Sequence, residues 1–299
     1  MININGVTKY YDTFKSLDNV SAVISNGSIF GIVGSNGSGK STLLRIMCGI
    51  FRADGGEVLY NGENIYENVA MKDKVIYLSD DQFFLPGSTL SDMAKMYAAV
   101  YSSFSFETYN KLVDLFGLPK GRKISSFSKG MQKQAAILLG LSAKPQFLLC
   151  DETFDGLDPV MRQLVKRILA EEVAENGLTP IIASHNLREL EDICDHIGLL
   201  HKGGILFESE IDSLKENIHT VQAVFSRDVS TDEIAKMGTV SIKQRGSMVT
   251  AVVRGTRGEV ERKIEELSPD FYEIIPLTLE EIFISEMEER GYDYTKVVF

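Results

Sequence analysis

The 299-residue sequence has no tryptophan, seven prolines and three cysteines, Cys48, Cys150 and Cys194. The thiols are odd in number and lack the Cys-x-x-Cys spacing, so we expect neither a disulfide framework nor a zinc centre. Unpaired thiols are typical of a reducing compartment.

Basic residues are also in the minority, with 31 Lys and Arg against 42 Asp and Glu and a formal net charge of -11. General nucleic-acid binders usually present a basic face, so we expect no nucleic-acid partner. Long apolar runs are missing: residues 135–143 fall short of the roughly 18 residues that a membrane-spanning helix needs. The N-terminal stretch MININGVTKYYDTF lacks the basic start and apolar stretch of a secretory signal. We therefore expect a cytoplasmic protein that reaches a membrane only through a partner.

Strand-like and helix-like segments alternate over residues 1–215. Strands are expected at 28–33, 57–60, 74–79, 146–152 and 179–185, helices at 159–175 and 187–195, and a hairpin at 198–209. Residues 88–140 differ, because two helices beginning at Ser88 or Ser91 and at Ser105 precede the helix that follows FSKGMQ. The alternation predicts an α/β domain with a mainly parallel, covered sheet and a helical subdomain at about 88–140.

The tail, residues 216–299, predicts a separate small α+β domain. Its segments read as a strand, a helix, two hairpin strands, a helix and a strand, at 221–226, 231–237, 239–244, 248–254, 258–267 and 271–277. That β-α-β-β-α-β order is the ferredoxin-like pattern. A closing amphipathic helix is expected at 278–291.

The stretch GSNGSGKST, residues 34–42, follows a predicted strand and opens a predicted helix, which is the context that a phosphate-binding P-loop requires. Glycines let the backbone curl so that successive N–H groups point at phosphate oxygens, and the helix N-terminus adds positive potential. Lys40 is expected to reach the β- and γ-phosphates, Ser41 to offer its hydroxyl to Mg²⁺, and Thr42 to lie on the α-phosphate side. The alternative is a flexible glycine loop.

Asp151 and Glu152 end the apolar run FLLCDE at the carboxyl edge of a predicted strand, where ligands bind in open α/β sheets. Asp151 is expected to orient Mg²⁺ beside Ser41, and Glu152 to polarise the attacking water as a general base. His185 ends a second strand at the same edge and is expected to sense the γ-phosphate. The alternative is that the acids only cap a helix and the histidine is structural.

With these motifs in order, residues 1–215 resemble the nucleotide-binding subunits of ATP-binding cassette (ABC) transporters, whose cofactors are ATP and Mg²⁺. The resemblance implies a P-loop NTPase fold and gives roles to residues that spacing alone does not explain. Tyr11, or its neighbour Tyr10, matches the aromatic that stacks on adenine, and Asp158 matches the acid of the loop between subunits. The nucleotide-binding residues it implies are Tyr11, Gly34, Ser35, Asn36, Gly37, Ser38, Gly39, Lys40, Ser41, Thr42, Ser128, Gly130, Gln132 and Asp158.

Three departures from the family pattern stand out, and one is Asp155, which stands where many members carry Ser or Asn. Phe127 and Lys129 replace the leucine and first glycine of the Leu-Ser-Gly-Gly-Gln signature, which Ser128, Gly130 and Gln132 match. The glutamine usual after the third strand falls at Asp80, with Gln82 two residues later. Because an acid can still orient metal or water, Asp80 joins Ser41 and Asp151 as an expected metal residue.

The resemblance also implies a mechanism. Two cassettes would meet head to tail, in a homo- or heterodimer, with each ATP between one phosphate loop and the other signature, and hydrolysis would drive a membrane-spanning permease. The tail and Asp80 favour a bacterial exporter, so the chain would lie on the inner face of the cell membrane. A soluble ABC-type ATPase linked to nucleic acid or ribosomes, and a nucleotide-gated regulatory module, are the alternatives. Residues 80–97 are the candidate groove for the permease, unless their aromatic and Met side chains are simply core.

Overall fold

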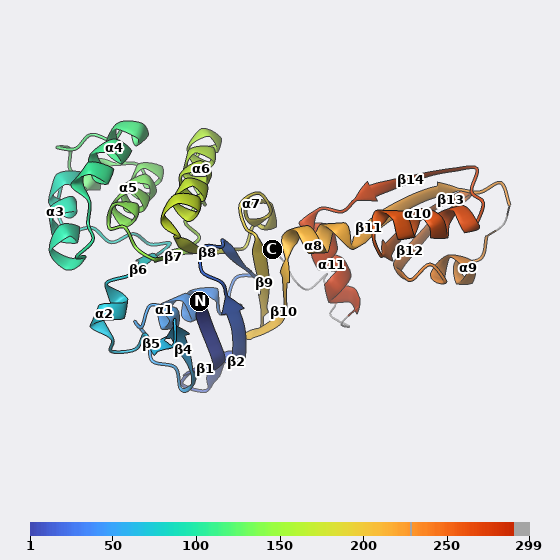
Figure 1. The fold of residues 1–299 in the computed structure, drawn as a ribbon, viewed down its shortest axis with the longest axis horizontal. Coiled ribbons are helices and arrows are strands. Elements are labelled where there is room, and N and C mark those ends of the chain that lie inside the picture. The colour runs from blue at the N-terminus through green and yellow to red at the C-terminus, as the bar shows by residue number, and fades with distance from the viewer. Residues whose placement is uncertain (228, 290–299) are drawn as a thin grey trace. The chain divides into compact units, whose positions relative to one another are not determined.

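The structure is a computed structural model that describes residues 1–227 and 229–289 (Figure 1). The chain divides into two compact units, Met1–Glu208 and Ser209–Phe299. Each unit is described by itself below.

An antiparallel sheet opens the first unit, in the order β2-β1-β4-β5. Its strands are β1 (Ile2–Tyr11), β2 (Phe14–Ile24), β4 (Gly55–Tyr60) and β5 (Glu63–Asn64). The sequence analysis missed the long β1–β2 hairpin, although Ile2 and Ile4 are buried on one face as a half-buried strand requires. The register of β1 on β2 shifts beyond Ile4, so strict alternation does not continue along the strand.

The central sheet has the order β10-β9-β3-β8-β7-β6, and its β9, β3, β8, β7 and β6 neighbours pair in parallel. Its strands are β3 (Phe30–Val33), β6 (Val75–Leu78), β7 (Phe147–Asp151), β8 (Thr179–Ser184), β9 (His196–His201) and β10 (Gly204–Glu210). Every residue of β3, β7 and β8 is buried, because both faces of a parallel sheet are covered. The predicted strands and the predicted β9–β10 hairpin are confirmed.

Helices flank this sheet (Figure 1). The helices of the first unit are α1 (Lys40–Met47), α2 (Val69–Lys72), α3 (Leu90–Val100), α4 (Phe106–Phe116), α5 (Lys129–Ser142), α6 (Pro159–Asn176) and α7 (Leu187–Glu191). Helices α3 and α4 both contact α5, and the three span residues 90–142, close to the helical region expected at about 88–140. Thr89 caps α3 through a capping box with Asp92, so the start lies between the two serines considered from the sequence; Ser105 caps α4 as predicted.

The core of the first unit joins both sheets through α1. Tyr60 and Phe147 are fully buried, with ring centroids 4.7 Å apart in an edge-to-face arrangement. The Tyr60 hydroxyl donates to the Met47 carbonyl at 2.8 Å, which ties β4 to the end of α1. The helix that follows the phosphate loop is therefore anchored at its far end to the first sheet.

The second unit contains a four-stranded antiparallel sheet in the order β12-β13-β11-β14. Its elements are α8 (Ile211–Glu216), β11 (Ile218–Val224), α9 (Thr231–Ala235), β12 (Thr239–Arg245), β13 (Met248–Arg254), α10 (Arg257–Glu266), β14 (Phe271–Pro276) and α11 (Leu279–Glu289). From β11 to β14 this is the predicted ferredoxin-like order. Val221 and Val253 of the sheet pack with Val260 of α10 in one core. The predicted end of the last helix, residues 290–291, lies outside the described residues.

Within the two described ranges, no helix combines the length and the apolar character needed to cross a lipid bilayer.

Candidate nucleotide site

The loop between β3 and α1 is shaped by close backbone approaches. A Cβ on Gly34 would lie 2.3 Å from the Leu200 carbonyl oxygen, and one on Gly39 would lie 2.8 Å from the Ser16 carbonyl oxygen. Gly39 also has φ of +109°, a conformation that L side chains rarely adopt. Glycine is thus required at both ends of the loop by the structure itself, which argues against a merely flexible glycine run.

Lys40 is the first residue of α1 and is only 5% exposed. Its Nζ donates to the Gly34 carbonyl at 2.6 Å and lies 3.4 Å from Oε1 of Glu152. No side chain caps α1 at Gly39, which leaves the first N–H groups of the helix to an anion or to solvent. A buried ammonium beside an uncapped helix start is a cationic cradle of the kind that binds phosphate.

Two buried oxygens near this cradle have no hydrogen-bond partner within the described ranges: the Ser38 Oγ and Oδ1 of Asp151. Buried polar atoms are normally partnered, so both are suited to a ligand. Of the other loop side chains, Ser41 is half-buried, while Thr42 accepts a hydrogen bond from Ser16 at 3.1 Å. Ser35 is half-buried, and Asn36 and Gly37 are exposed. The residues present thus fit a nucleotide phosphate and an oxygen-seeking metal.

Asp151 is held from the side opposite its free oxygen. Tyr77, on the neighbouring strand β6, donates its hydroxyl to Oδ2 of Asp151 at 2.9 Å. Burial, and then the charge of Asp151, raise the pKa of Tyr77 well above its usual value, so the phenol stays a donor. Asp151 itself is 2% exposed. The sequence analysis did not single out Tyr77; an aromatic with a polar tip inside a buried strand was the available signal.

Glu152 lies at the junction of the cradle and His185. Its Oε2 is 2.9 Å from Nδ1 of His185 and 3.4 Å from the His185 backbone N–H, while Oε1 faces Lys40. Its backbone has φ of +48°, which is uncommon for a residue other than glycine. Such strain tends to be found at functional positions. The structure thus brings together Lys40, Glu152 and His185, as expected from the sequence.

The signature stretch begins α5, where the Ser128 hydroxyl accepts from the Met131 N–H at 3.2 Å as an N-cap. A Cβ on Gly130 would lie 3.2 Å from the Gly156 carbonyl oxygen, so this position needs a small residue. The Gln132 amide turns back to the carbonyls of Phe127 at 3.3 Å and Ile124 at 3.5 Å. The Gln132 amide thus stabilises the helix start. Counted from Phe127, the fifth position of the signature, where the family has glutamine, is Met131 rather than Gln132.

A cavity of about 470 Å³ separates this helix start from two loops. It is lined by Asp80, Asp81, Gln82, Lys129, Gly130, Gln132, Lys133, Asp155 and Gly156. Asp80 is paired with Lys133 at 3.1 Å rather than with a group of the phosphate loop. Gln82 hydrogen-bonds the Ser79 carbonyl. Asp158, expected between subunits, caps α6 by accepting from the Met161 N–H at 2.9 Å.

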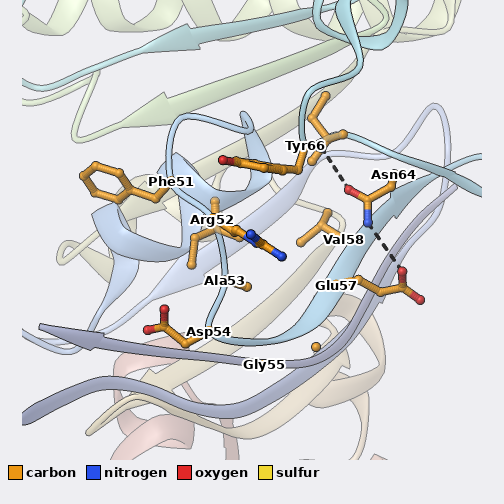
Figure 2. Close-up of a pocket in the computed structure, with 12 residues that line it drawn as sticks. Phe51, Arg52, Ala53, Asp54, Gly55, Glu57, Val58, Asn64 and Tyr66 are labelled. Atoms are coloured by element: carbon orange, nitrogen blue, oxygen red, sulfur yellow. Dashed lines mark hydrogen bonds between the residues drawn. The ribbon is translucent and has the colours of Figure 1, made fainter.

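Tyr11 lies apart from these groups, at the end of β1. Its ring meets Phe51 edge to face, with centroids 6.1 Å apart, and 41% of the residue is exposed. Tyr10, the other tyrosine considered, is about equally exposed, and the Lys15 ammonium lies over its ring. Phe51 also lines a hollow of about 420 Å³ beside β4, where Figure 2 shows the Arg52 guanidinium against the Tyr66 ring.

Fold and site together define a P-loop nucleotide-binding protein. The sequence profile of the family described as ABC transporter matches residues 17–155. The ABC transporter ATP-binding protein YtrB of Bacillus subtilis is 32% identical over 96% of this chain and 98% of its own. The bacitracin transport ATP-binding protein BcrA of Bacillus licheniformis is 29% identical over 72% of each chain.

Two solved structures show the same fold. The ATP-binding subunit of an ABC transporter superposes with a TM-score of 0.67 at 23% identity, over 72% of this chain and 92% of its own. A dimeric ATP-binding cassette bound to ADP and Pi superposes with a TM-score of 0.65 at 23% identity, over 71% and 99%. The chain belongs to the ATP-binding proteins of ABC transporters, a family of ATPases.

Proposed function

We propose that this protein hydrolyses ATP at the site built around Glu152 and drives export of a substrate through a separate membrane permease. The observation that carries the hydrolytic part is the Glu152 carboxylate, which lies 3.4 Å from the Lys40 ammonium and 2.9 Å from the His185 imidazole. Transport is supported by two relatives named as bacitracin transport proteins. The direction, export, is our inference from the acid at Asp80 and the small α+β tail. A permease and a second ATPase subunit are the partners that this role requires.

ATP with Mg²⁺ supplies the phosphoryl group and the metal charge that offsets the developing negative charge. The chain's own residues bind and orient. N–H groups of the loop at residues 34–42 and the Lys40 ammonium donate to phosphate oxygens. An incoming phosphate therefore competes with Glu152 for that ammonium. Asp151 and Ser41 would hold the metal, with Tyr77 fixing the Asp151 carboxylate.

Once Lys40 turns to phosphate, Oε1 of Glu152 becomes the acceptor for the proton of an attacking water. His185 keeps Oε2 in place through the 2.9 Å contact and lies where its other ring nitrogen can face phosphate. Because Ser128 and Gly130 belong to the opposite side of a head-to-tail dimer in this proposal, each site is complete only when two subunits meet.

Glu152→Gln tests the assignment, because the amide keeps the shape and cannot accept the proton. We expect phosphate release to fall by at least about 100-fold, the usual range for a general base, while ATP-dependent dimerisation on a sizing column persists. Glu175→Gln, an exposed carboxylate on α6, is the matched control and should hydrolyse as the unaltered protein does. Undiminished turnover in Glu152→Gln would remove Glu152 from this role.

Export through a permease needs its own test. We expect the full chain to co-purify from a detergent extract with a protein of several membrane spans, and its ATPase rate to change with that partner present. An extract in which no such protein accompanies the chain would favour the soluble ATPase instead.

A further inference from the structure

Lys133 occupies the first turns of α5, immediately after the signature stretch, and its side chain is only 12% exposed. Its ammonium contacts two elements that are distant in sequence. It donates to the backbone carbonyl of Glu152 at 2.8 Å and to Oδ1 of Asp80 at 3.1 Å. A lysine on a helix normally extends into solvent, so this enclosed position between two loops calls for an explanation.

The carbonyl that Lys133 holds belongs to the residue with unusual backbone geometry. Glu152 has φ of +48°, and its own N–H donates to the Ala183 carbonyl at 2.9 Å. The residue is thus fixed on both sides: β8 holds its amide, and Lys133 holds its carbonyl. This backbone conformation directs the carboxylate toward Lys40 and His185 rather than along the line of β7.

Asp80 completes the arrangement from the loop after β6. Its carboxylate is 63% exposed, and the ammonium of Lys133 is its partner. An exposed ion pair by itself contributes little to stability. The pair instead sets a direction, because the acid holds the flexible lysine side chain across the N-terminal end of α5, toward the Glu152 carbonyl.

We propose that Lys133 is a positioning residue for Glu152, and that Asp80 acts through Lys133 rather than as a metal ligand. The inference rests on the proposed function of Glu152 as general base. Asp80 and Gln82 line the same cavity as Lys133, so a shift of that loop is transmitted to the backbone of Glu152 through one ammonium. The loop that the sequence analysis placed near the permease is thereby connected to the hydrolytic carboxylate within one subunit.

The test compares Lys133→Met, which keeps the length and loses the charge and donors, with Lys133→Arg in the full chain. We expect Lys133→Met to lower kcat by about 10- to 100-fold, the range for residues that orient a reacting group. The KM for ATP and the affinity for a fluorescent ATP analogue should stay within about threefold, because the phosphate loop is untouched. Lys133→Arg should restore kcat to within about threefold. Lys111→Met, an exposed lysine of α4, is the matched control.

Asp80→Asn supplies the second measurement, and it serves alone if Lys133→Met fails to fold. We expect a severalfold lower kcat with an unchanged KM, and the double variant should be no slower than Lys133→Met, because residues acting through one contact are not additive. Effects that multiply, or an Asp80→Asn variant that needs far more Mg²⁺, would overturn the part given to Asp80. A Lys133→Met enzyme with kcat within about twofold of the unaltered protein would overturn the inference as a whole.

Glu152→Gln distinguishes the two levels of failure. If the unaltered protein turns over ATP, Glu152→Gln does not and Lys133→Met does, only the Lys133 inference fails. If Glu152→Gln turns over ATP as fast as the unaltered protein, the proposed function fails, and the Lys133 inference fails with it.

Discussion

Replacing Tyr77 with phenylalanine removes one atom from the site, the hydroxyl that donates to Oδ2 of Asp151 at 2.9 Å. Asp151 is 2% exposed and its Oδ1 already has no partner in the described part of the chain, so the carboxylate loses the hydrogen bond that the structure gives it. A hydrogen bond to a charged group contributes about 1.5–3 kcal/mol. We expect the free energy of unfolding, measured with urea in the absence of nucleotide, to fall by that amount.

The same substitution should affect metal use. Residues that orient a metal-binding carboxylate change metal affinity or activity by about 10- to 100-fold when they are removed. The Mg²⁺ concentration that gives half-maximal ATPase activity should therefore rise by at least about tenfold in Tyr77→Phe. Tyr97→Phe removes the same atom from a ring of α3 that packs on Tyr101, the residue after the helix. It should leave both quantities unchanged.

The two measurements can refute the reasoning separately. A stability within about 0.5 kcal/mol of the unaltered protein would show that the hydroxyl does not support Asp151. A normal stability loss with an unchanged Mg²⁺ requirement would show that Asp151 is structural, and that the metal is held elsewhere.

Two further predictions concern α6 and the thiols. Asp158→Ala should cost about 1 kcal/mol of stability, because α6 loses its N-cap, while Asp158→Asn should keep the cap and lower only ATPase activity. Equal stability of the two variants and the unaltered protein in urea would show that the cap contributes nothing. Burial raises the pKa of Cys150 to about 12, and also raises those of Cys48 and Cys194, so the folded state keeps protons that the unfolded state loses above about pH 8.5. The stability that these thiols contribute should therefore be fully present below that pH and fall above it, by at most about 1.4 kcal/mol per thiol per pH unit. A thiol reagent at pH 8 should label none of the three buried thiols until urea unfolds the chain. Prompt labelling of the folded protein would contradict this.

The sequence alone predicted most of the fold, because its signals were local. Apolar runs such as residues 179–185 and the cap at Ser105 act through their own neighbours, and the structure has β8 and α4 there. The β1–β2 hairpin was missed because its register shifts break the alternation that identifies a half-buried strand. The short helix α2 was missed because four residues carry too little periodicity.

The site divides in the same way. Motif residues are recognisable because their spacing is set by one loop or one strand end, as for Lys40, Glu152 and His185. Tyr77 and Lys133 contact residues on other strands and loops, so their importance depends on which segments pack together. The spacing of residues along the chain does not reveal such contacts. Comparison with the family signature likewise does not show that the Gln132 amide donates to the carbonyls of Phe127 and Ile124.

The pairing of Asp80 with Lys133 changes what the departure at Asp80 means. Judged from the sequence, the acid in place of glutamine is a further residue that could orient metal or water, beside Ser41 and Asp151. Such an acid also adds negative charge near a site that must bind phosphate, and like charges repel. The structure places a lysine between this acid and the site, 3.1 Å from the Asp80 carboxylate and 2.8 Å from the Glu152 carbonyl. The negative charge of Asp80 is thus offset by the Lys133 ammonium, which lies between Asp80 and Glu152. Because of this offset, an acid at this position need not disfavour phosphate binding.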